Sequence, residues 1–395
     1  MTYLRDNAQT GRSVLPDLVR ACALLGIVLV NVAYFAYPAE ITYHDGGLNS
    51  WLDSTAFFSV DSLFLFKSYS LFSFMFGVGL AHQMMAAARR GSSFTASYLR
   101  RMLGLIVLGI LHVTLAFMGD ILILYGVLGV ILFFFRNRSQ KFLVRAGIAL
   151  FALQVIVALL FALGLYLGET CAPDEMSKAL AEVNNSIKAS NAVFANGSLS
   201  EIARLRWQNW IGMVLYLVPL QAPGALGFFF IGLASVRSGV LADPKAPLWA
   251  RSRRVYLPAG VLVSILGSTI LFNSPNPNSS GALVGMALLL LAAPFSSLGY
   301  IGLIAKWAEG PVTKLTVFIA RGGTASLTAY LLQSLVLSLV FCGYGLGLYR
   351  EISAFNCIAL ALCTGLFSIA IVSIWRMKFR HGPFEVLLRK WTYQV

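Results

Sequence analysis

The chain alternates between long apolar runs and short polar connections along nearly its whole length. A helix that crosses a bilayer needs about 20 predominantly apolar residues, and ten runs come near that length. They cover roughly residues 18–37, 57–88, 102–118, 121–135, 142–167, 209–236, 255–272, 281–305, 324–344 and 354–375. The pattern predicts an all-α, polytopic integral membrane protein with about ten transmembrane helices, forming a single transmembrane domain over residues 1–395.

The connections between the runs are mostly short. Residues 119–120 leave room only for a very tight turn between the third and fourth runs. The one long polar connection, about 168–206, is predicted to be a loop with a turn at residues 196–197. Pro219 and Pro223 fall inside the sixth run and predict a broken helix there, as in many transporters and membrane enzymes.

Composition and charge agree with a membrane location. Of the 395 residues, 58% are hydrophobic and 12% are charged, whereas soluble domains carry about 25% charged residues. The net charge of +14 does not indicate nucleic-acid binding, because the basic residues cluster between the apolar runs. With the N-terminus in the cytoplasm, 24 of the 30 Lys and Arg residues fall on the cytoplasmic side. We therefore expect both termini and the tail 376–395 in the cytoplasm, and segment 168–206 outside it.

Several kinds of site are not expected. The five cysteines include no CxxC pair, which argues against a disulfide framework or a zinc site. The four histidines are widely spread, so no metal site is predicted. The chain also lacks a phosphate-binding loop, a dinucleotide fingerprint, a GxSxG elbow and an HExxH helix.

Polar residues inside apolar runs are costly and mark candidate functional positions. In the first run, Asp17 and Arg20 share a helix face, and Asn31 lies roughly 16 Å deeper at 1.5 Å per residue. These three side chains could line a substrate cavity. Their structural alternative is a helix cap, an arginine reaching toward the membrane surface, and an interhelical hydrogen bond.

His112 is the most informative polar residue, because it lies among Leu, Ile and Val in the third run. Asp120 follows at the turn into the fourth run, with Tyr125 close behind. A histidine with a carboxylate in reach is the minimal general-base pair for activating a hydroxyl or an amine. The structural alternatives are an interhelical hydrogen bond for the histidine and a helix cap for the aspartate.

Two further groups of polar residues are weaker candidates. His44 precedes Asp45 in the connection after the first run, on the same predicted side of the membrane as Asp120. Tyr330 and Gln333 lie in the ninth run and could line a polar cavity or bond neighbouring helices.

Several of these segments resemble the YeiB-like family of bacterial membrane proteins. Residues 15–21 and 30–32 are similar to its opening "LDxLRG…LVN", and residues 71–79 to its "LFSxLFGxG". Residues 100–122 match the family pattern "RRL…GLLH…GDIL", and residues 327–334, 345–349 and 382–393 match its C-terminal signature. The resemblance covers nearly the whole chain in the right order and implies a multi-pass protein of the bacterial inner membrane.

More distantly, the chain resembles transmembrane acyltransferases such as heparan glucosaminide acetyltransferase and the bacterial sugar O-acyltransferases. In the first of these a histidine in the loop after the first helix is implicated in acetyl transfer, and His44 lies loosely at that position. In the sugar O-acyltransferases the catalytic histidine ends the first helix, where this chain has Asn31.

The sequence thus leads to one main hypothesis, a transmembrane acyltransferase that uses cytoplasmic acyl-CoA and no metal. The donor phosphates would be held by Arg20, Arg100 and Arg101. His112 or His44 would act as the general base, oriented by Asp120. The residues expected to line the substrate cavity are Asp17, Asn31, Tyr125, Tyr330 and Gln333.

The alternative hypothesis is a transporter or permease for a small molecule, which would use the same polar residues as a substrate path. For the enzyme, the acceptor at the outer face would be a small molecule, a lipid or a glycan. The expected surroundings are membrane lipid, without nucleic acid, and the chain could also associate with copies of itself.

Overall fold

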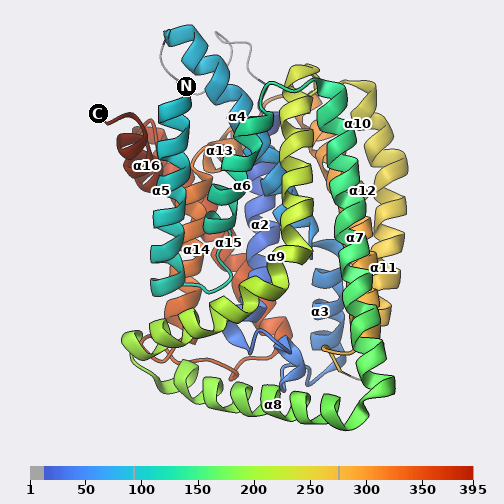
Figure 1. Ribbon diagram of the computed structural model, residues 1–395. Coiled ribbons are helices and arrows are strands. Elements are labelled where there is room, and N and C mark those ends of the chain that lie inside the picture. Colours follow the sequence, from blue (N-terminus) through green and yellow to red (C-terminus); the bar gives the residue numbers. More distant parts are fainter. Residues whose placement is uncertain (1–12, 92–93, 275, 395) are drawn as a thin grey trace.

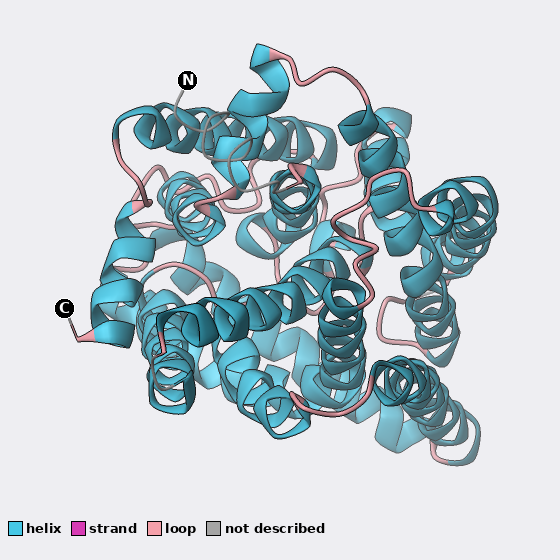
Figure 2. Cartoon of the chain, turned by 90° about the horizontal axis from the view of Figure 1, so that it is seen from above, coloured by secondary structure: helices cyan, strands magenta, loops and turns pink. Residues whose placement is uncertain are grey.

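The computed structural model describes residues 13–91, 94–274 and 276–394 (Figure 1). Within these residues all regular structure is helical, and most of the helices are seen nearly end-on from above (Figure 2). The prediction of an all-α fold is confirmed. The first 12 residues, which were predicted to lie in the cytoplasm, are outside the described part.

The helices follow one another with short connections. In chain order they are α2 (Leu15–Ala36), α3 (Trp51–Leu63), α4 (Lys67–Arg90), α5 (Phe94–Leu115), α6 (Leu122–Phe135), α7 (Gln140–Cys171), α8 (Pro173–Asn196), α9 (Leu199–Arg237), α10 (Pro247–Arg251), α11 (Leu257–Asn273), α12 (Ser280–Glu309), α13 (Lys314–Gly323), α14 (Ser326–Phe341), α15 (Ala354–Lys378) and α16 (Pro383–Tyr393). A 3₁₀ turn (Thr42–His44) follows α2, and a π-helical turn (Ser252–Tyr256) joins α10 to α11.

Eight helices or helix pairs among the described residues are long and apolar enough to cross a membrane. A ninth is formed if α13 and α14, which are bent by 78° at their junction, count as one span. The apolar helix α6 has 14 residues and is shorter than a typical span. These elements together account for the ten apolar runs of the sequence.

The outer surface of the bundle is strongly apolar. On α7, Ile148, Ile156 and Leu160 are each more than half exposed, and Leu262 and Leu266 of α11 are similar. Soluble monomers rarely expose continuous apolar surface of this kind. The protein is therefore a multi-pass membrane protein whose lipid-facing wall includes α7 and α11.

The second apolar run is two helices rather than the single over-long helix that the sequence predicted. The chain leaves the helical conformation after Leu63 and re-enters it at Lys67, and Phe66 adopts a left-handed backbone conformation with φ of 63°. The freed backbone carbonyls find partners: the Tyr300 hydroxyl donates to the Leu63 oxygen at 2.7 Å. Lys67 is buried, and its Nζ lies 3.4 Å from the Asp61 backbone oxygen.

The segment predicted as a long polar loop is mostly helical. Helix α8 lies across one end of the bundle (Figure 1), and its own side chains Ile187 and Phe194 are buried. Pro173 and two acidic residues in its first turn favour helix initiation, a signal that the overall polarity of the segment obscured. The predicted turn at residues 196–197 lies between α8 and α9, as expected.

Helix α9 runs without a break through Pro219 and Pro223. Figure 1 shows it bending instead, with an oblique first half beside α8 and an upright second half. The predicted break is thus a bend, as proline inside a helix often produces. Near the bend, the Gln154 Nε2 of α7 donates to the Leu220 backbone oxygen at 2.6 Å and ties α9 to α7.

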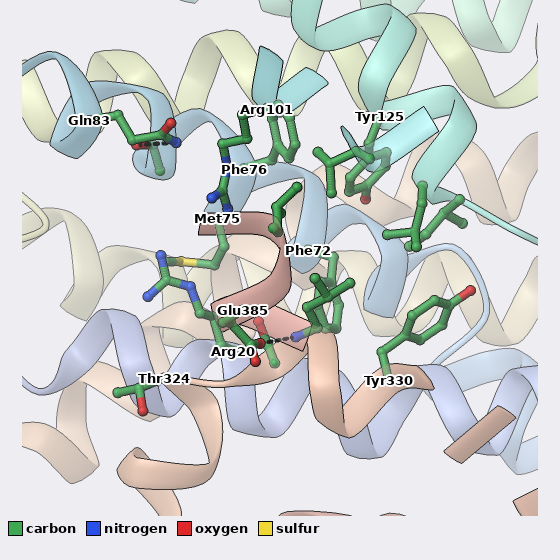
Figure 3. Close-up of a pocket in the computed structure, with 17 residues that line it drawn as sticks. Arg20, Phe72, Met75, Phe76, Gln83, Arg101, Tyr125, Thr324, Tyr330 and Glu385 are labelled. Atoms are coloured by element: carbon green, nitrogen blue, oxygen red, sulfur yellow. Dashed lines mark hydrogen bonds between the residues drawn. The ribbon is translucent and has the colours of Figure 1, made fainter. Parts of the chain in front are cut away.

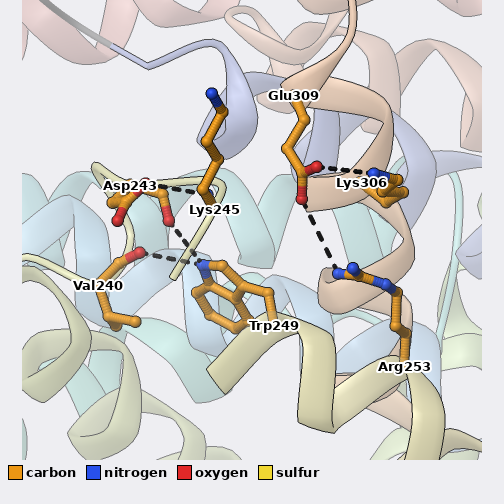
Figure 4. Close-up of polar contacts among 7 residues, drawn as sticks. All are labelled: Val240, Asp243, Lys245, Trp249, Arg253, Lys306 and Glu309. Atoms are coloured by element: carbon orange, nitrogen blue, oxygen red, sulfur yellow. Dashed lines mark hydrogen bonds and ion pairs between the residues drawn. The ribbon is translucent and has the colours of Figure 1, made fainter. Parts of the chain in front are cut away.

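The opposite end of the bundle carries the arginine pairs 89–90 and 100–101 and is called the basic end below. There, the Trp249 indole N–H donates to the backbone oxygens of Val240 and Asp243 at 3.0 and 3.1 Å (Figure 4). Glu309, at the end of α12, contacts Lys306 at 2.8 Å and Arg253 at 3.9 Å. These contacts fix the connection between α9 and α11 against α12.

The centre of the bundle depends on a close crossing of α4 and α9. A Cβ atom placed on Gly77 would lie 2.0 Å from the Phe229 backbone oxygen, and one on Gly232 would lie 2.0 Å from the Phe74 oxygen. Each helix therefore presents a glycine to the backbone of the other. Close backbone approach through small residues is a common way for membrane helices to associate.

Gly77→Val tests this crossing. We expect it to lower the free energy of unfolding by ~3 kcal/mol, since overpacking against a backbone cannot be relieved by a side-chain rotation. The measurement is thermal unfolding of the purified protein in detergent. Gly79→Ala is the matched control, because the nearest atom to its Cβ is the Gln83 amide at 3.9 Å. Equal stability of the two variants would contradict the crossing.

Candidate functional site

A cavity of about 270 Å³ opens among α2, α4, α5, α6, α14 and α16 and is called the arginine cavity (Figure 3). It carries Arg20, Arg101 and Gln83 toward one end and Tyr125 and Tyr330 toward the other. Between these groups lie Phe72, Met75 and Phe76, with Glu385 beside them. The lining residues are Arg20, Phe72, Met75, Phe76, Gly79, Gln83, Arg101, Leu105, Ile121, Leu122, Tyr125, Thr324, Ser326, Leu327, Tyr330, Glu385 and Leu388.

The two adjacent arginines of α5 have different surroundings. Arg101 lines the cavity, whereas the Arg100 Nε donates to the Thr392 backbone oxygen of α16 at 2.9 Å. The Trp391 indole N–H donates back to the Arg100 oxygen at 2.8 Å. Consecutive helical residues point about 100° apart, so only one of the pair can face the cavity. Of the three predicted phosphate-binding arginines, Arg20 and Arg101 line the cavity and Arg100 holds α16.

The short helix α16 forms part of the cavity wall through Glu385. One oxygen of its carboxylate accepts hydrogen bonds from the backbone N–H groups of Leu327 and Thr328 at 2.8 and 3.1 Å. The Thr328 hydroxyl donates to the other oxygen. Glu385 therefore occupies the positive N-terminal end of α14, where an anion is favoured.

A second cavity, of about 380 Å³, lies closer to the α8 end and is called the aromatic cavity. Its wall comes from α2, the α3–α4 break, the α5–α6 turn, α6 and α9. Most lining groups are aromatic or aliphatic, and the polar ones include Asn31, Asp120 and Gln221. The aromatic lining residues are Tyr34, Phe64, Phe66, Tyr69, Phe117 and Trp210.

His112 and Asp120 form a hydrogen-bonded pair between these cavities. The His112 Nδ1 lies 2.8 Å from the Asp120 Oδ1, and both side chains are almost fully shielded from solvent. The Asp120 Oδ2 accepts the Ile123 backbone N–H at 2.8 Å, at the beginning of α6. The helix N-terminus favours the negative charge of the carboxylate, and the carboxylate in turn orients the imidazole.

A glycine in α5 makes room for this arrangement. A Cβ atom on Gly109 would lie 2.7 Å from the Asp120 Oδ2 and 2.8 Å from the Ile123 nitrogen. The absence of a side chain at Gly109 therefore lets the α5–α6 turn fold back against α5. That turn brings Asp120 to the imidazole in only eight residues of sequence.

The pair stands where the two cavities approach each other. Asp120 lines the aromatic cavity, and the His112 ring packs against Tyr330 of the arginine cavity, with ring centroids 5.1 Å apart. Ile121 lines both cavities. Within the described residues the His112 Nε2 is buried and has no hydrogen-bond partner. His112 itself is not a lining residue of either cavity. An imidazole held at Nδ1 by a carboxylate and unpartnered at Nε2 is suited to accept a proton from a ligand hydroxyl that reaches it.

The other predicted site residues divide into two groups. Tyr125 and Tyr330 line the arginine cavity, and Asn31 lines the aromatic cavity. Asp17 is fully buried beside Arg20, with 2.9 Å between carboxylate and guanidinium. Gln333 is also buried and donates to the Ser368 hydroxyl at 2.9 Å. Neither Asp17 nor Gln333 lines a cavity.

His44 and Asp45 do not form a pair. The His44 ring packs against Phe57 and Phe272 at 5.7 and 6.4 Å between centroids. Asp45 instead contacts Arg350 and accepts a hydrogen bond from the Asn191 amide of α8 at 3.2 Å. Neither His44 nor His112 belongs to a cavity lining, but His112 is paired with Asp120, which lines the aromatic cavity. The geometry therefore favours His112 over His44 as the base.

Most of the cavity residues were not identified from the sequence, and four of them carry polar or large aromatic side chains that bear on ligand binding. Gln83 and Glu385 line the arginine cavity, and Trp210 and Gln221 line the aromatic cavity. Gln83 lies six residues before the arginine pair 89–90, near the end of an apolar run, which could have indicated it. No cluster of metal-ligating side chains occurs in the part of the chain that the structure describes.

The fold and these two cavities define a class, a polytopic α-helical membrane protein with a buried histidine–aspartate pair between an arginine-bearing and an apolar cavity. The chain belongs to the YeiB-like family of membrane proteins. Over 97% of its length it is 30% identical to the uncharacterized protein YeiB of Escherichia coli (strain K12), of which it covers 97%.

Other comparisons agree with this assignment. The chain is 29% identical to the uncharacterized protein YxaH of Bacillus subtilis (strain 168), over all of this chain and 97% of that protein. Residues 235–395 match the family described as "Protein of unknown function (DUF418)". No solved structure matches the chain.

Glu385→Ala tests how α16 is held against the arginine cavity. Losing this carboxylate leaves two N-terminal N–H groups of α14 without their acceptor, at a cost of ~1–2 kcal/mol. We expect trypsin to remove the C-terminal segment roughly tenfold faster, since cleavage follows the population of the open form. Loss of a C-terminal affinity tag measures the rate. Glu351→Ala, at an exposed position, is the control, and an unchanged rate for Glu385→Ala would contradict this role.

Proposed function

We propose that this protein is a transmembrane acyltransferase of the bacterial inner membrane that takes the acyl group from cytoplasmic acyl-CoA. The observation that carries the proposal is the His112–Asp120 pair, which stands between two cavities and whose imidazole Nε2 has no hydrogen-bond partner in the described part of the chain. A reaction between two ligands that arrive from different sides needs a base at the point where the cavities approach each other.

The donor site is the arginine cavity. Placing the basic end in the cytoplasm follows from the distribution of Lys and Arg. Arg20 and Arg101 would then face the donor phosphates, for which guanidinium groups are well suited. The thioester end of the donor would point away from the arginines, toward Tyr125 and Tyr330.

The reaction is direct transfer in a ternary complex. His112 Nε2 takes the proton of an acceptor hydroxyl as its oxygen attacks the thioester carbonyl. The new C–O bond forms as the C–S bond breaks, and the proton passes to the departing CoA sulfur. The products are an ester and free CoA, and no oxidant, reductant or metal is consumed.

Tyr330 is placed to assist this step. Its hydroxyl is buried and has no partner of ordinary hydrogen-bond geometry among the described residues. It lines the arginine cavity beside the His112 ring. A phenol O–H directed at the thioester oxygen would stabilise the negative charge that develops there.

Donor binding is the first test. We expect Arg101→Ala to weaken binding of octanoyl-CoA to the detergent-solubilised protein about 10–100-fold, because a hydrogen bond to a charged group contributes ~1.5–3 kcal/mol. His112→Ala should bind as wild type does. Arg254→Ala, which is exposed at the basic end outside the cavity, is the control.

If acetyl-, octanoyl- and palmitoyl-CoA all fail to bind, the acyltransferase proposal is wrong. The same cavities would then be better explained as a substrate path of a transporter, in which bent helix pairs such as α13–α14 commonly line the binding site.

Asp120→Asn tests the base. The Ile123 N–H needs an acceptor, so the new amide oxygen would turn to it and the NH₂ group would face His112 Nδ1. The imidazole would then carry its proton on Nε2 and could not act as a base. We expect transfer of label from [¹⁴C]acetyl-CoA in membrane vesicles to fall ~10²–10⁴-fold, with donor affinity unchanged.

The control for this experiment is Asp174→Asn, at an exposed position in the first turn of α8. Wild-type transfer by the Asp120→Asn variant would show that His112 does not act as the base.

A further inference from the structure

The aromatic cavity differs from the arginine cavity in its charge. Two arginines line the arginine cavity, whereas neither lysine nor arginine lines the aromatic one. Asp120 is its one charged lining residue, and both of its carboxylate oxygens are already engaged, by His112 and by the Ile123 N–H. A ligand with a phosphate or carboxylate would find no counter-charge here, and a protonated amine would have to compete for a carboxylate whose two oxygens each already accept a hydrogen bond. The occupant should therefore be uncharged.

The polar groups that remain for a ligand are few. The Ser68 hydroxyl donates to the Phe64 backbone oxygen at 3.2 Å, and the Tyr69 hydroxyl accepts from Gln154 at 3.0 Å. No hydrogen bond from a described residue engages the side-chain amides of Asn31 or Gln221. A sugar would leave most of its hydroxyls unpaired in such a cavity, at a cost of ~1–3 kcal/mol each. A ligand with one hydroxyl on an apolar body fits better.

At α6 and α9 the lining of the cavity reaches the apolar surface of the bundle. Val127 lines the cavity and is also 47% exposed. Across from α6, the α9 residues Trp210 and Val214 line the cavity, while their neighbours Ile211 and Leu215 are 60% and 75% exposed. The rim of the cavity is thus continuous with a surface that faces lipid, and an apolar ligand could enter from the bilayer.

The α8 end of the cavity is covered by protein. Met118 and Ala39 line the cavity and pack in the same cluster as Phe194 of α8. Helix α8 is held there by Asn191, whose amide donates to Asp45 at 3.2 Å and whose oxygen accepts the Tyr349 hydroxyl at 3.2 Å. Burial raises the pKa of Tyr349, so its hydroxyl stays a donor at any physiological pH. This cover favours entry from the side over entry from water.

We propose that the aromatic cavity binds a neutral, membrane-dissolved lipid with a single hydroxyl group, which enters between α6 and α9. This inference rests on the proposed acyl transfer and names its acceptor. The hydroxyl lies at the Asp120 end of the cavity, beside the His112–Asp120 pair, and the apolar body lies among Phe64, Phe66 and Trp210. The reaction product is then a lipid ester that returns to the bilayer by the same opening.

The test uses a long-chain alcohol that carries a photoactivatable diazirine, added to phosphatidylcholine vesicles that contain the full-length protein. After irradiation, mass spectrometry maps the labelled peptides. We expect label on residues 121–127 and 210–221, and we expect Val127→Trp to reduce it several-fold by filling the opening. Ile131→Trp is the control, since Ile131 is exposed one turn further along α6 and lies outside the lining. Val214→Phe is the second blocking variant, used if Val127→Trp does not fold.

Competition defines the ligand class. Unlabelled dodecanol should reduce the labelling, whereas dodecyl phosphate, dodecylamine and glucose at the same concentration should not. Labelling that spreads equally over the lipid-facing helices α7 and α11, or that is unchanged in both blocking variants, would overturn the proposal. Equal competition by the phosphate would overturn the claim that the ligand is neutral.

The outcome is separable from that of the acyl-transfer proposal, because labelling requires neither acyl-CoA nor the base. His112→Ala should therefore label as wild type does. Specific labelling without any acyl transfer would leave the lipid site standing and remove its proposed chemistry. Acyl transfer to a water-soluble acceptor, without labelling by the lipid probe, would support the acyltransferase proposal and rule out the lipid site.

Discussion

Backbone N–H and C=O groups cannot remain unpaired in the hydrocarbon core of a membrane, so non-helical backbone is tolerated there only where it is buried in protein or lines a cavity. Among the described residues, interruptions of the helical backbone at residues 64–66, 116–121 and 324–325 separate consecutive helices. The first two interruptions line the aromatic cavity, and residues of the second and third line the arginine cavity. The non-helical segments between the helices therefore form part of the walls of the two cavities.

The two cavities differ in charge: arginines line one of them, and the other is mainly apolar. The basic end places two arginines in one cavity, and the other cavity contains aromatic rings and two uncommitted carboxamides. The His112–Asp120 pair stands between them because the α5–α6 turn is too tight to carry Asp120 elsewhere. A charged donor and an apolar acceptor would each find a matching surface, and the two cavities approach each other beside the His112–Asp120 pair, where Ile121 lines both.

Much of this could be predicted from the sequence, because hydropathy and the distribution of basic residues follow directly from the membrane environment. The pairing of His112 with Asp120 was predictable for a local reason, since eight residues and a tight turn separate them. The break at Phe66 was not, because no glycine or proline marks it. Nor could sequence decide between Arg100 and Arg101, since the choice depends on where α16 docks. The role of Glu385 could not be predicted either, because its carboxylate binds the N-terminus of α14, which lies 57 residues earlier in the sequence.

The central claim is that ligands of the two cavities meet at the His112 imidazole. The most direct measurement is an experimental structure of the protein with a non-transferable thioether analogue of octanoyl-CoA. The account predicts phosphates beside Arg20 and Arg101, and the carbon that replaces the thioester carbonyl close enough to His112 Nε2 for a bound hydroxyl to lie between them. An analogue bound outside the arginine cavity, or with its reactive end turned away from His112, would contradict the account.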